Sequence, residues 1–253
     1  MRHFLTILSH EIRTLLYNPS TYIAAVLFLG VMGFVFAGIL DLYSRSPQET
    51  QPSIIFFQLF WIPVFFMVPL LTMKCIAEER RLGTLETLLT APVSTTEMVL
   101  GKFGAAYLLY LLLWASTLGF HYVLQHYAGD ARYLDPGPLL GGYLFIAVSG
   151  LLFVSLGVLA SALTRSQAVA GILCFSMLFG LVIGFRYLGE LTTLDTEALH
   201  HVKVTVDSLQ VFRHLDDFSH GVIDTRQIIF YVSGSVLALI FSILGVEAKL
   251  LQG

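Results

Sequence analysis

Long apolar runs separated by short polar connections make up most of the chain. A helix needs about 20 apolar residues to cross the hydrocarbon core of a bilayer. Six stretches are long enough, at roughly 21–40, 54–73, 99–124, 139–163, 168–186 and 228–246. Lipid cannot satisfy open backbone groups, and the alternating ten-residue pattern of barrel strands is absent. The pattern therefore predicts an all-α polytopic membrane protein, with residues 1–253 forming a single transmembrane domain of six helices.

The first 17 residues form a separate amphipathic element. Apolar side chains recur there at helical spacing, namely Phe4, Leu5, Leu8, Ile12, Leu15 and Leu16. Arg2, Glu11 and Arg13 lie off this stripe, and Asn18-Pro19 favours a break before the first span. We expect residues 1–17 to lie on the inner leaflet as an interfacial helix. The alternative is an ordinary extension of the first span.

The connection between the second and third spans is unusually elaborate and reads "EERRLGTLETLLTAPVSTTEMVLGKF". Its leucines fall on one face of a short helix: Leu82, Leu85, Leu88 and Leu89. Glu78 and Glu79 suit the start of that helix and Pro92 its end, which predicts a helix over 78–92. Ser94 followed by Glu97 predicts a capping box for the third span. The leucine stripe fits the membrane surface and a groove on a soluble partner equally well.

A second long connection, 187–226, precedes the last span. Its apolar residues at three-residue spacing are Leu209, Phe212, Leu215 and Phe218, which predicts a short helix. Gly221 suits the position after that helix, and Asp224 with Gln227 resembles a capping box for the last span. We expect this loop to hold short amphipathic helices packed against the outer membrane boundary.

Composition agrees with a membrane location. Hydrophobic residues make up 56% of the chain and charged residues only 12%, whereas soluble domains carry about 25% charged residues. The net charge of −3 excludes a basic surface for nucleic acid. The two cysteines, Cys75 and Cys174, are too few for a disulfide framework in a chain of this length and are expected as buried thiols.

The distribution of basic residues predicts the orientation. With the N-terminus inside, eight of the fourteen Lys and Arg residues fall in inner segments: Arg2, Arg13, Lys74, Arg80, Arg81, Lys102, Arg165 and Lys249. The first two outer loops then hold only Arg45 and Arg132. Because cytoplasmic segments carry the excess of positive charge, and six spans return the chain to its starting side, we expect both termini in the cytoplasm.

Several kinds of chemistry are missing from the sequence. His121 is the only ionisable residue well inside an apolar stretch, which disfavours coupling to an ion gradient. Gly101-Lys102 is followed by Phe103 and does not make a phosphate-binding loop, and no nucleophile elbow or zinc-protease motif occurs. The adjacent pair His200-His201 is more typical of solvated loop residues than of a metal site. The chain is thus not predicted to be an enzyme or to bind a metal, and its energy should come from a cytoplasmic partner.

The connector resembles the coupling-helix segment of type-2 ABC exporter permeases. The matching positions are Glu78, Glu79, Arg80, Arg81, Gly83, Thr84, Glu86, Leu88, Leu89, Pro92, Gly101 and Lys102. The stretches "GVLASALTRSQAVAGIL" and "FSHGVIDTRQIIFYVS" are similar to the turn between the fourth and fifth spans and to the entry of the last span. The most similar branch contains gliding-motility permeases and the permease for nitrous-oxide-reductase maturation.

This resemblance implies a multi-pass permease of the inner (cytoplasmic) membrane. It would pair with a second copy or a related permease and sit on a soluble ABC ATPase dimer, which holds the ATP and Mg while the chain itself needs no cofactor. The implied docking residues are Glu78, Glu79, Arg80, Arg81, Gly83, Thr84, Leu85, Glu86, Leu88 and Leu89. The N-terminal helix would be a second contact with the ATPase. The implied extracytoplasmic gate is Leu209, Phe212, Leu215 and Phe218.

Three functions follow as hypotheses. The first is an ABC permease that exports a substrate. The second is a mechanotransmitter that uses the same ATPase to drive an extracytoplasmic auxiliary protein and translocates nothing. The third, disfavoured by the missing intramembrane charges, is a stand-alone channel or carrier.

Overall fold

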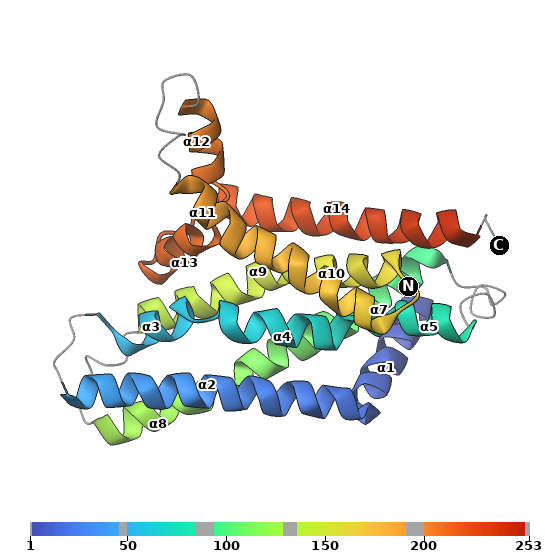
Figure 1. Ribbon diagram of the computed structural model, residues 1–253. Coiled ribbons are helices and arrows are strands. Elements are labelled where there is room, and N and C mark those ends of the chain that lie inside the picture. Colours follow the sequence, from blue (N-terminus) through green and yellow to red (C-terminus); the bar gives the residue numbers. More distant parts are fainter. Residues whose placement is uncertain (1, 46–49, 84–93, 129–135, 191–199, 251–253) are drawn as a thin grey trace.

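The computed structural model describes residues 2–45, 50–83, 94–128, 136–190 and 200–250, and this part of the chain is a bundle of helices (Figure 1). Within it, six helical segments are long and apolar enough to cross a membrane: Pro19–Arg45, Trp61–Leu82, Thr95–His126, Pro136–Leu163, Gln167–Gly189 and Thr225–Ala248. The predicted all-α architecture with six spans is therefore confirmed.

The elements follow one another along the chain as helices of very different length. They are α1 (Arg2–Tyr17), α2 (Pro19–Arg45), α3 (Pro52–Gln58), α4 (Trp61–Thr72), α5 (Ala77–Leu82), α7 (Thr95–Ser116), α8 (Leu118–Ala128), α9 (Pro136–Leu163), α10 (Gln167–Phe179), the π-helical turn η2 (Gly180–Gly184), α11 (Phe185–Gly189), α12 (His200–Asp207), α13 (Val211–Ser219) and α14 (Thr225–Leu250).

The second span begins later than the apolar run predicts. The run starts near Ile54, but α3 ends at Gln58 and a new helix begins at Trp61. Pro63 explains the break, because it has no N–H to donate to the carbonyl of Leu59 four residues earlier. The expected single helix over 54–73 is therefore two helices, of which α3 lies outside the candidate span.

The third span also consists of two helices, α7 and α8. Thr117 separates them, and its hydroxyl donates to the Trp114 carbonyl at 2.6 Å. His121, the ionisable residue expected inside this span, is 2% exposed in α8 and lies against the rings of Phe56 and Tyr143. It belongs to an aromatic cluster and not to a polar pathway.

The helix α9 is the centre of the bundle and packs against α4, α7, α10, α13 and α14. Small residues let its neighbours approach closely. A Cβ at Gly157 would lie 2.3 Å from the Thr72 hydroxyl of α4, and one at Gly150 would lie 2.3 Å from the Tyr110 ring of α7. Close backbone approach at small residues is a principal source of helix association in membranes.

The bundle has two distinct ends (Figure 1). Both chain termini and α5 lie at one end, which we call the terminal end, while α3 and α13 lie at the other, which we call the far end. The short helix α12 projects away from the bundle. This arrangement places the start of the charged connector beside α1 and separates it from the loop that precedes the last span.

Three of the four residues of the predicted stripe in that loop lie in α13, and Leu209 precedes it. Leu215 and Phe218 are fully buried, while Phe212 and Leu209 are partly buried. Gly221 has a φ of +77°, as predicted for the residue that follows the helix. The four residues proposed as an extracytoplasmic gate thus belong to the packed far end of the bundle.

The start of the last span differs in detail from a capping box. The Asp224 carboxylate accepts a hydrogen bond from the N–H of Arg226 at 2.8 Å, so it does cap α14. The Gln227 amide instead donates to the Asp217 carboxylate of α13 at 2.6 Å. By contrast, the capping box of Ser94 and Glu97 at the start of α7 is present as predicted.

A substitution at Gly141 should weaken the far end. A Cβ at Gly141 would lie 1.9 Å from the carbonyl oxygen of Phe218, which is backbone and cannot rotate away. We expect Gly141→Ala to displace α13 and lower the free energy of unfolding by about 1–3 kcal/mol, the range for overpacking. The control is Gly38→Ala in α2, where nothing lies within 4 Å of the added Cβ. Denaturant titration of both variants in detergent checks this, and equal stabilities would contradict the packing described for α13.

Candidate functional site

The terminal end contains a junction of three elements: α1, α5 and the first turns of α7. The helix α1 lies directly on α7 because two glycines leave room for it. A Cβ at Gly101 would lie 2.6 Å from Ile7, and one at Gly104 would lie 3.1 Å from Leu8. The helix predicted from the N-terminal apolar stripe therefore exists, and part of its apolar side is used for contact with the third span.

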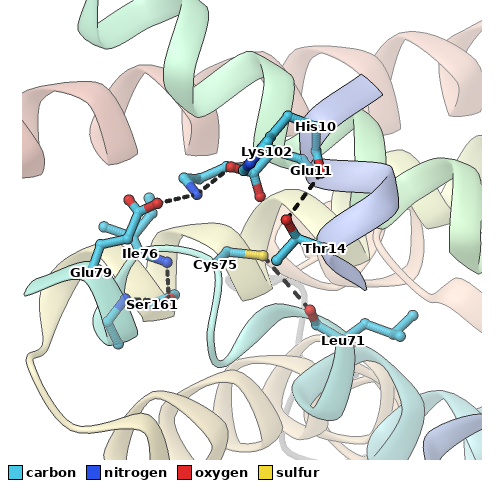
Figure 2. A network of polar contacts seen from close by, with 10 residues as sticks. His10, Glu11, Thr14, Leu71, Cys75, Ile76, Glu79, Lys102 and Ser161 are labelled. Carbon is cyan, nitrogen blue, oxygen red and sulfur yellow. Dashed lines mark hydrogen bonds and ion pairs between the residues drawn. The ribbon is translucent and has the colours of Figure 1, made fainter. Parts of the chain in front are cut away.

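A buried ionic triad lies at the centre of this junction (Figure 2). The Lys102 ammonium donates to the Glu11 carboxylate at 2.7 Å and to the Glu79 carboxylate at 2.6 Å. The Lys102 side chain is only 4% exposed, and the two glutamates are 17% and 19% exposed. Glu11 belongs to α1, Glu79 to α5 and Lys102 to α7.

The triad joins elements that are far apart in the sequence. Lys102 is 91 residues from Glu11 and 23 from Glu79. Charge-assisted hydrogen bonds are about twice as strong as neutral ones, and a buried charge is tolerated only when it is paired. Because a single cation serves both carboxylates, separating α5 from α7 would leave Glu79 without this cation. The triad therefore favours movement of the three elements as one unit.

The turn between α4 and α5 is fixed to the central helix by Ser161 of α9. Its hydroxyl oxygen accepts hydrogen bonds from the N–H groups of Ile76 and Ala77, each at 3.0 Å, and its O–H donates to the Met73 carbonyl at 3.2 Å. Figure 2 shows Ser161 and Ile76 below Lys102. One hydroxyl thus satisfies three backbone groups that the turn leaves without helical partners.

Arg80 fastens α5 to two further helices. Its guanidinium donates to the Ala162 carbonyl in the last turn of α9 and, at 3.0 Å, to the Gly245 carbonyl in α14. A cation is favourable at the C-terminal turn of a helix, where carbonyls lack helical partners. The six residues of α5 therefore contact α7 through Glu79, and α9 and α14 through Arg80.

The far end contains a second polar site around His214 of α13. Its Nε2 lies 3.0 Å from the Ser208 carbonyl, and its Nδ1 lies 2.9 Å from the Tyr231 hydroxyl of α14. Because a carbonyl can only accept, Nε2 carries the proton, and Nδ1 accepts from Tyr231. Burial lowers the pKa of His214, although the Ser208 carbonyl and the charges of Asp217 and Asp224 oppose this. The neutral ring therefore ties α13 to the last span.

This lowered pKa predicts a loss of stability in acid. The unfolded chain has a His pKa of about 6.5 and takes the proton first, so the contribution is complete above that pH and declines as pH falls towards the lower folded pKa. The slope from this one proton is at most about 1.4 kcal/mol per pH unit. Denaturant titrations at pH 7.5 and 5.5 should show a smaller loss in His214→Gln than in the native chain. An equal loss of stability in the native chain and in His214→Gln would contradict the assignment of this pH dependence to His214.

A family model for ABC-2 family transporter proteins matches residues 5–247, nearly the whole chain. The chain belongs to this family. No curated protein matches the chain. Membership makes it a transmembrane permease component of an ABC transporter, which functions with an ABC ATPase in the lipid bilayer. The family supplies the membrane component of the transporter, and the ATPase motifs are absent from this sequence.

Among the predicted docking residues that the structure describes, some point into the protein and others are exposed at the surface of the permease. Glu79 and Arg80 point into the protein and bind the groups described above. Arg81 and Gly83 are exposed, and Arg81 lies 3.9 Å from the partly exposed Glu78. The remaining predicted contacts lie outside the described residues: Thr84, Leu85, Glu86, Leu88 and Leu89.

The helix at the start of the connector is shorter than the sequence predicts. We expect one helix over 78–92, but α5 ends at Leu82 because Gly83 adopts a left-handed conformation with φ of +70°. Residues 84–93 lie outside the described part, so Glu78 and Glu79 belong to a helix that does not continue through Gly83. The glycine of the Gly-Thr pair in the resemblance motif is thus a helix-ending residue.

Two functional residues are missing from the sequence-based site. In the sequence, Glu11 is noted only as lying off the apolar stripe of the N-terminal helix, and Lys102 counts as one of the inner basic residues that set the orientation. The structure buries both in the triad. A weak signal was present, because Lys102 lies inside an apolar stretch and follows the glycine that admits α1.

Proposed function

We propose that this permease exports a substrate with energy from a separate ABC ATPase dimer, and that the junction of α1, α5 and α7 transmits the movement of the ATPase to the spans. The observation that carries this proposal is the buried triad of Glu11, Lys102 and Glu79. It binds the start of the charged connector to the third span and to the N-terminal helix. Such a link would pass a displacement of the connector directly to the bundle.

For this role, the protein would lie in the inner membrane of the cell with the terminal end of the bundle in the cytoplasm. Two observations support it. The excess of Lys and Arg lies in segments at that side, and both termini and α5 lie at the same end of the bundle (Figure 1). The connector would then be accessible to a soluble ATPase, while α12 and α13 would lie outside.

Movement of the ATPase would first displace the connector. Leu85 and Leu88 would enter a groove on the ATPase as apolar anchors, with Thr84, Glu86 and Leu89 beside them. Displacement would reach α7 through Glu79 and reach α9 and α14 through Arg80. Three spans would thereby respond to one short lever.

The far end would act as the extracytoplasmic gate. The gate residues Leu209, Phe212, Leu215 and Phe218 line α13 and its approach, and α13 packs on the central helix α9. Because α9 also receives Arg80 at its other end, it connects the lever with the gate. We place the permease in the gliding-motility and nitrous-oxide-reductase-maturation branch and expect it to pair with a second copy or a related permease.

A second function is supported by the outward helix α12. It projects from the far end in Figure 1, and Val204 on it is 54% exposed. An exposed apolar side chain on a projecting helix suits contact with an extracytoplasmic auxiliary protein. The permease would then do mechanical work on that protein without translocating a substrate.

Reconstitution distinguishes the two functions. The permease and its partner ABC ATPase would be placed in proteoliposomes, and ATP hydrolysis and the ATP-dependent uptake of candidate lipids, peptides and glycans would be measured together. Export predicts uptake that depends on ATP for at least one class of compound. Steady ATP hydrolysis with no uptake of any class would favour the mechanical function.

A further inference from the structure

The exposed side of α1 carries basic charge and no acidic charge. Glu11 is the only acidic residue in this helix, and it is turned inward to Lys102. Arg13 lies nearly opposite Glu11 around the helix, His10 lies about a quarter turn from Glu11, and both are exposed. In the part of the chain that the structure describes, Arg13 forms no ion pair. The internal pairing of Glu11 therefore leaves a basic surface on a helix at the membrane boundary.

An apolar groove lies beside this basic surface. It runs between α1 and α7, has a volume of about 110 Å³, and is lined by Ile12, Leu15, Leu16, Ala105, Leu108, Leu109 and Leu112. Leu16, Leu108 and Leu112 are 44%, 46% and 62% exposed, so the groove opens to the surroundings of the protein. Since α7 belongs to a membrane-spanning segment, those surroundings are lipid.

We propose that this groove holds an acyl chain of an anionic phospholipid whose phosphate is bound by Arg13. The groove has only apolar side chains, which suit a hydrocarbon chain and do not hold water. Arg13 directly follows Ile12 and precedes Leu16 by three residues, so it stands at the edge of the groove on the same helix. A guanidinium binds phosphate with two parallel hydrogen bonds, and His10 one turn earlier adds a further donor.

The basic surface also argues against a second copy of the chain as the occupant. Two copies related by a two-fold axis would contact each other through the same surface on both. A two-fold contact centred here would bring the two Arg13 guanidinium groups, together with both His10 rings, towards each other, while Glu11, the acidic residue of α1, is turned to Lys102. An anionic lipid supplies both the hydrocarbon and the opposite charge.

Binding of lipid here would strengthen the junction from the membrane side. Ile12 follows Glu11 of the triad, and Ala105 lies one turn after Lys102. An acyl chain between Ile12 and Ala105 would cover the contact of α1 with α7 beside the triad. This inference requires only the membrane-spanning fold, so it stands or fails independently of ATPase docking.

Native mass spectrometry of the full chain in detergent tests the phosphate contact. The protein would be titrated with phosphatidylglycerol and with phosphatidylcholine of identical acyl chains, and the dissociation constant of the first adduct would be measured for each. We expect tighter binding of phosphatidylglycerol, and Arg13→Gln should weaken it about fivefold, the factor that corresponds to about 1 kcal/mol per basic residue at a lipid surface. Binding of phosphatidylcholine, whose phosphate is offset by its own choline cation, should weaken less, so the preference for phosphatidylglycerol should fall.

The matched control is Arg226→Gln, which removes an exposed cation at the start of α14, at the opposite end of that helix from the C-terminus. It should retain the full preference for phosphatidylglycerol. An unchanged preference in Arg13→Gln, or an equal loss in both variants, would overturn the assignment of the phosphate to Arg13.

A second variant tests the groove itself. Leu108→Trp should fill the groove and weaken the first adduct of both lipids, whereas Leu237→Trp, at a similarly exposed leucine on α14, should not. Thermal unfolding would check that both tryptophan variants are folded. If Leu108→Trp is unfolded, the Arg13→Gln measurement alone tests the proposed lipid site. Unchanged lipid adducts together with loss of a dimer in Leu108→Trp would identify a second copy as the occupant and overturn the proposal.

Discussion

Lys102→Met should lower the free energy of unfolding of the permease by about 3 kcal/mol. The substitution removes the ammonium that both Glu11 and Glu79 bind and leaves two carboxylates, each less than one-fifth exposed, beside each other. Removing one partner of a buried ion pair costs about 3–5 kcal/mol, because the remaining charge is uncompensated. Denaturant titration in detergent measures the change, and limited proteolysis should show that α1 has separated from α7.

Two further variants isolate the effect of burial. Arg45→Gln breaks an exposed pair with Asp41 at 2.9 Å, in which the side chains are 76% and 57% exposed. It should change stability by less than about 0.5 kcal/mol. The triple variant Glu11→Gln, Lys102→Met, Glu79→Gln should recover much of the loss, because all three charges of the triad are removed together. A Lys102→Met chain as stable as the native one would show that the triad does not hold the junction together.

The spans could be predicted from the sequence because the membrane imposes them. A long apolar run in lipid must close its backbone hydrogen bonds internally, and six such runs gave six helical segments. Local signals were also sufficient where they involve neighbouring residues. Ser94 and Glu97 form the expected capping box, and Gly221 takes the expected left-handed conformation.

The junction could not be predicted in the same way, because it depends on contacts between distant segments. Nothing local in the sequence distinguishes Glu11, which binds Lys102, from a solvated glutamate on an amphipathic helix. Similarly, Arg80 and Arg81 are adjacent and identical in type, yet Arg80 turns to the ends of α9 and α14 while Arg81 is exposed. Only the packing of α5 among three helices decides between them.

The break in the second span shows a different limit of prediction from hydropathy. Hydropathy extends the second span to Ile54, since Gln58 is the one polar residue between Ile54 and Pro63. The missing N–H of Pro63 ends α3 before α4 begins, and the apolar α3 then packs against α9 and α13 at the far end. Hydropathy measures the preference of a segment for an apolar environment. The packed protein interior at the far end is such an environment, and so is lipid, so hydropathy does not distinguish them.

Substitution of two connector leucines should abolish assembly of the transporter. Leu85→Asp with Leu88→Asp places two charges on the apolar face that we propose as the anchor for the ATPase. Burying two unpaired carboxylates at an interface costs several kcal/mol, enough to reduce a micromolar contact to one that does not survive purification. Membrane insertion should be intact, because both positions lie between the second and third candidate spans.

Co-purification shows whether the connector docks the ATPase. The tagged permease would be extracted with its ATPase, and the amount of ATPase retained would be compared between the native chain, the double variant Leu85→Asp, Leu88→Asp and a control. The control is Val222→Asp with Ile223→Asp, two residues at the far end that are 57% and 54% exposed. We predict loss of the ATPase from the connector variant alone, whereas retention at the native level would contradict docking through this segment.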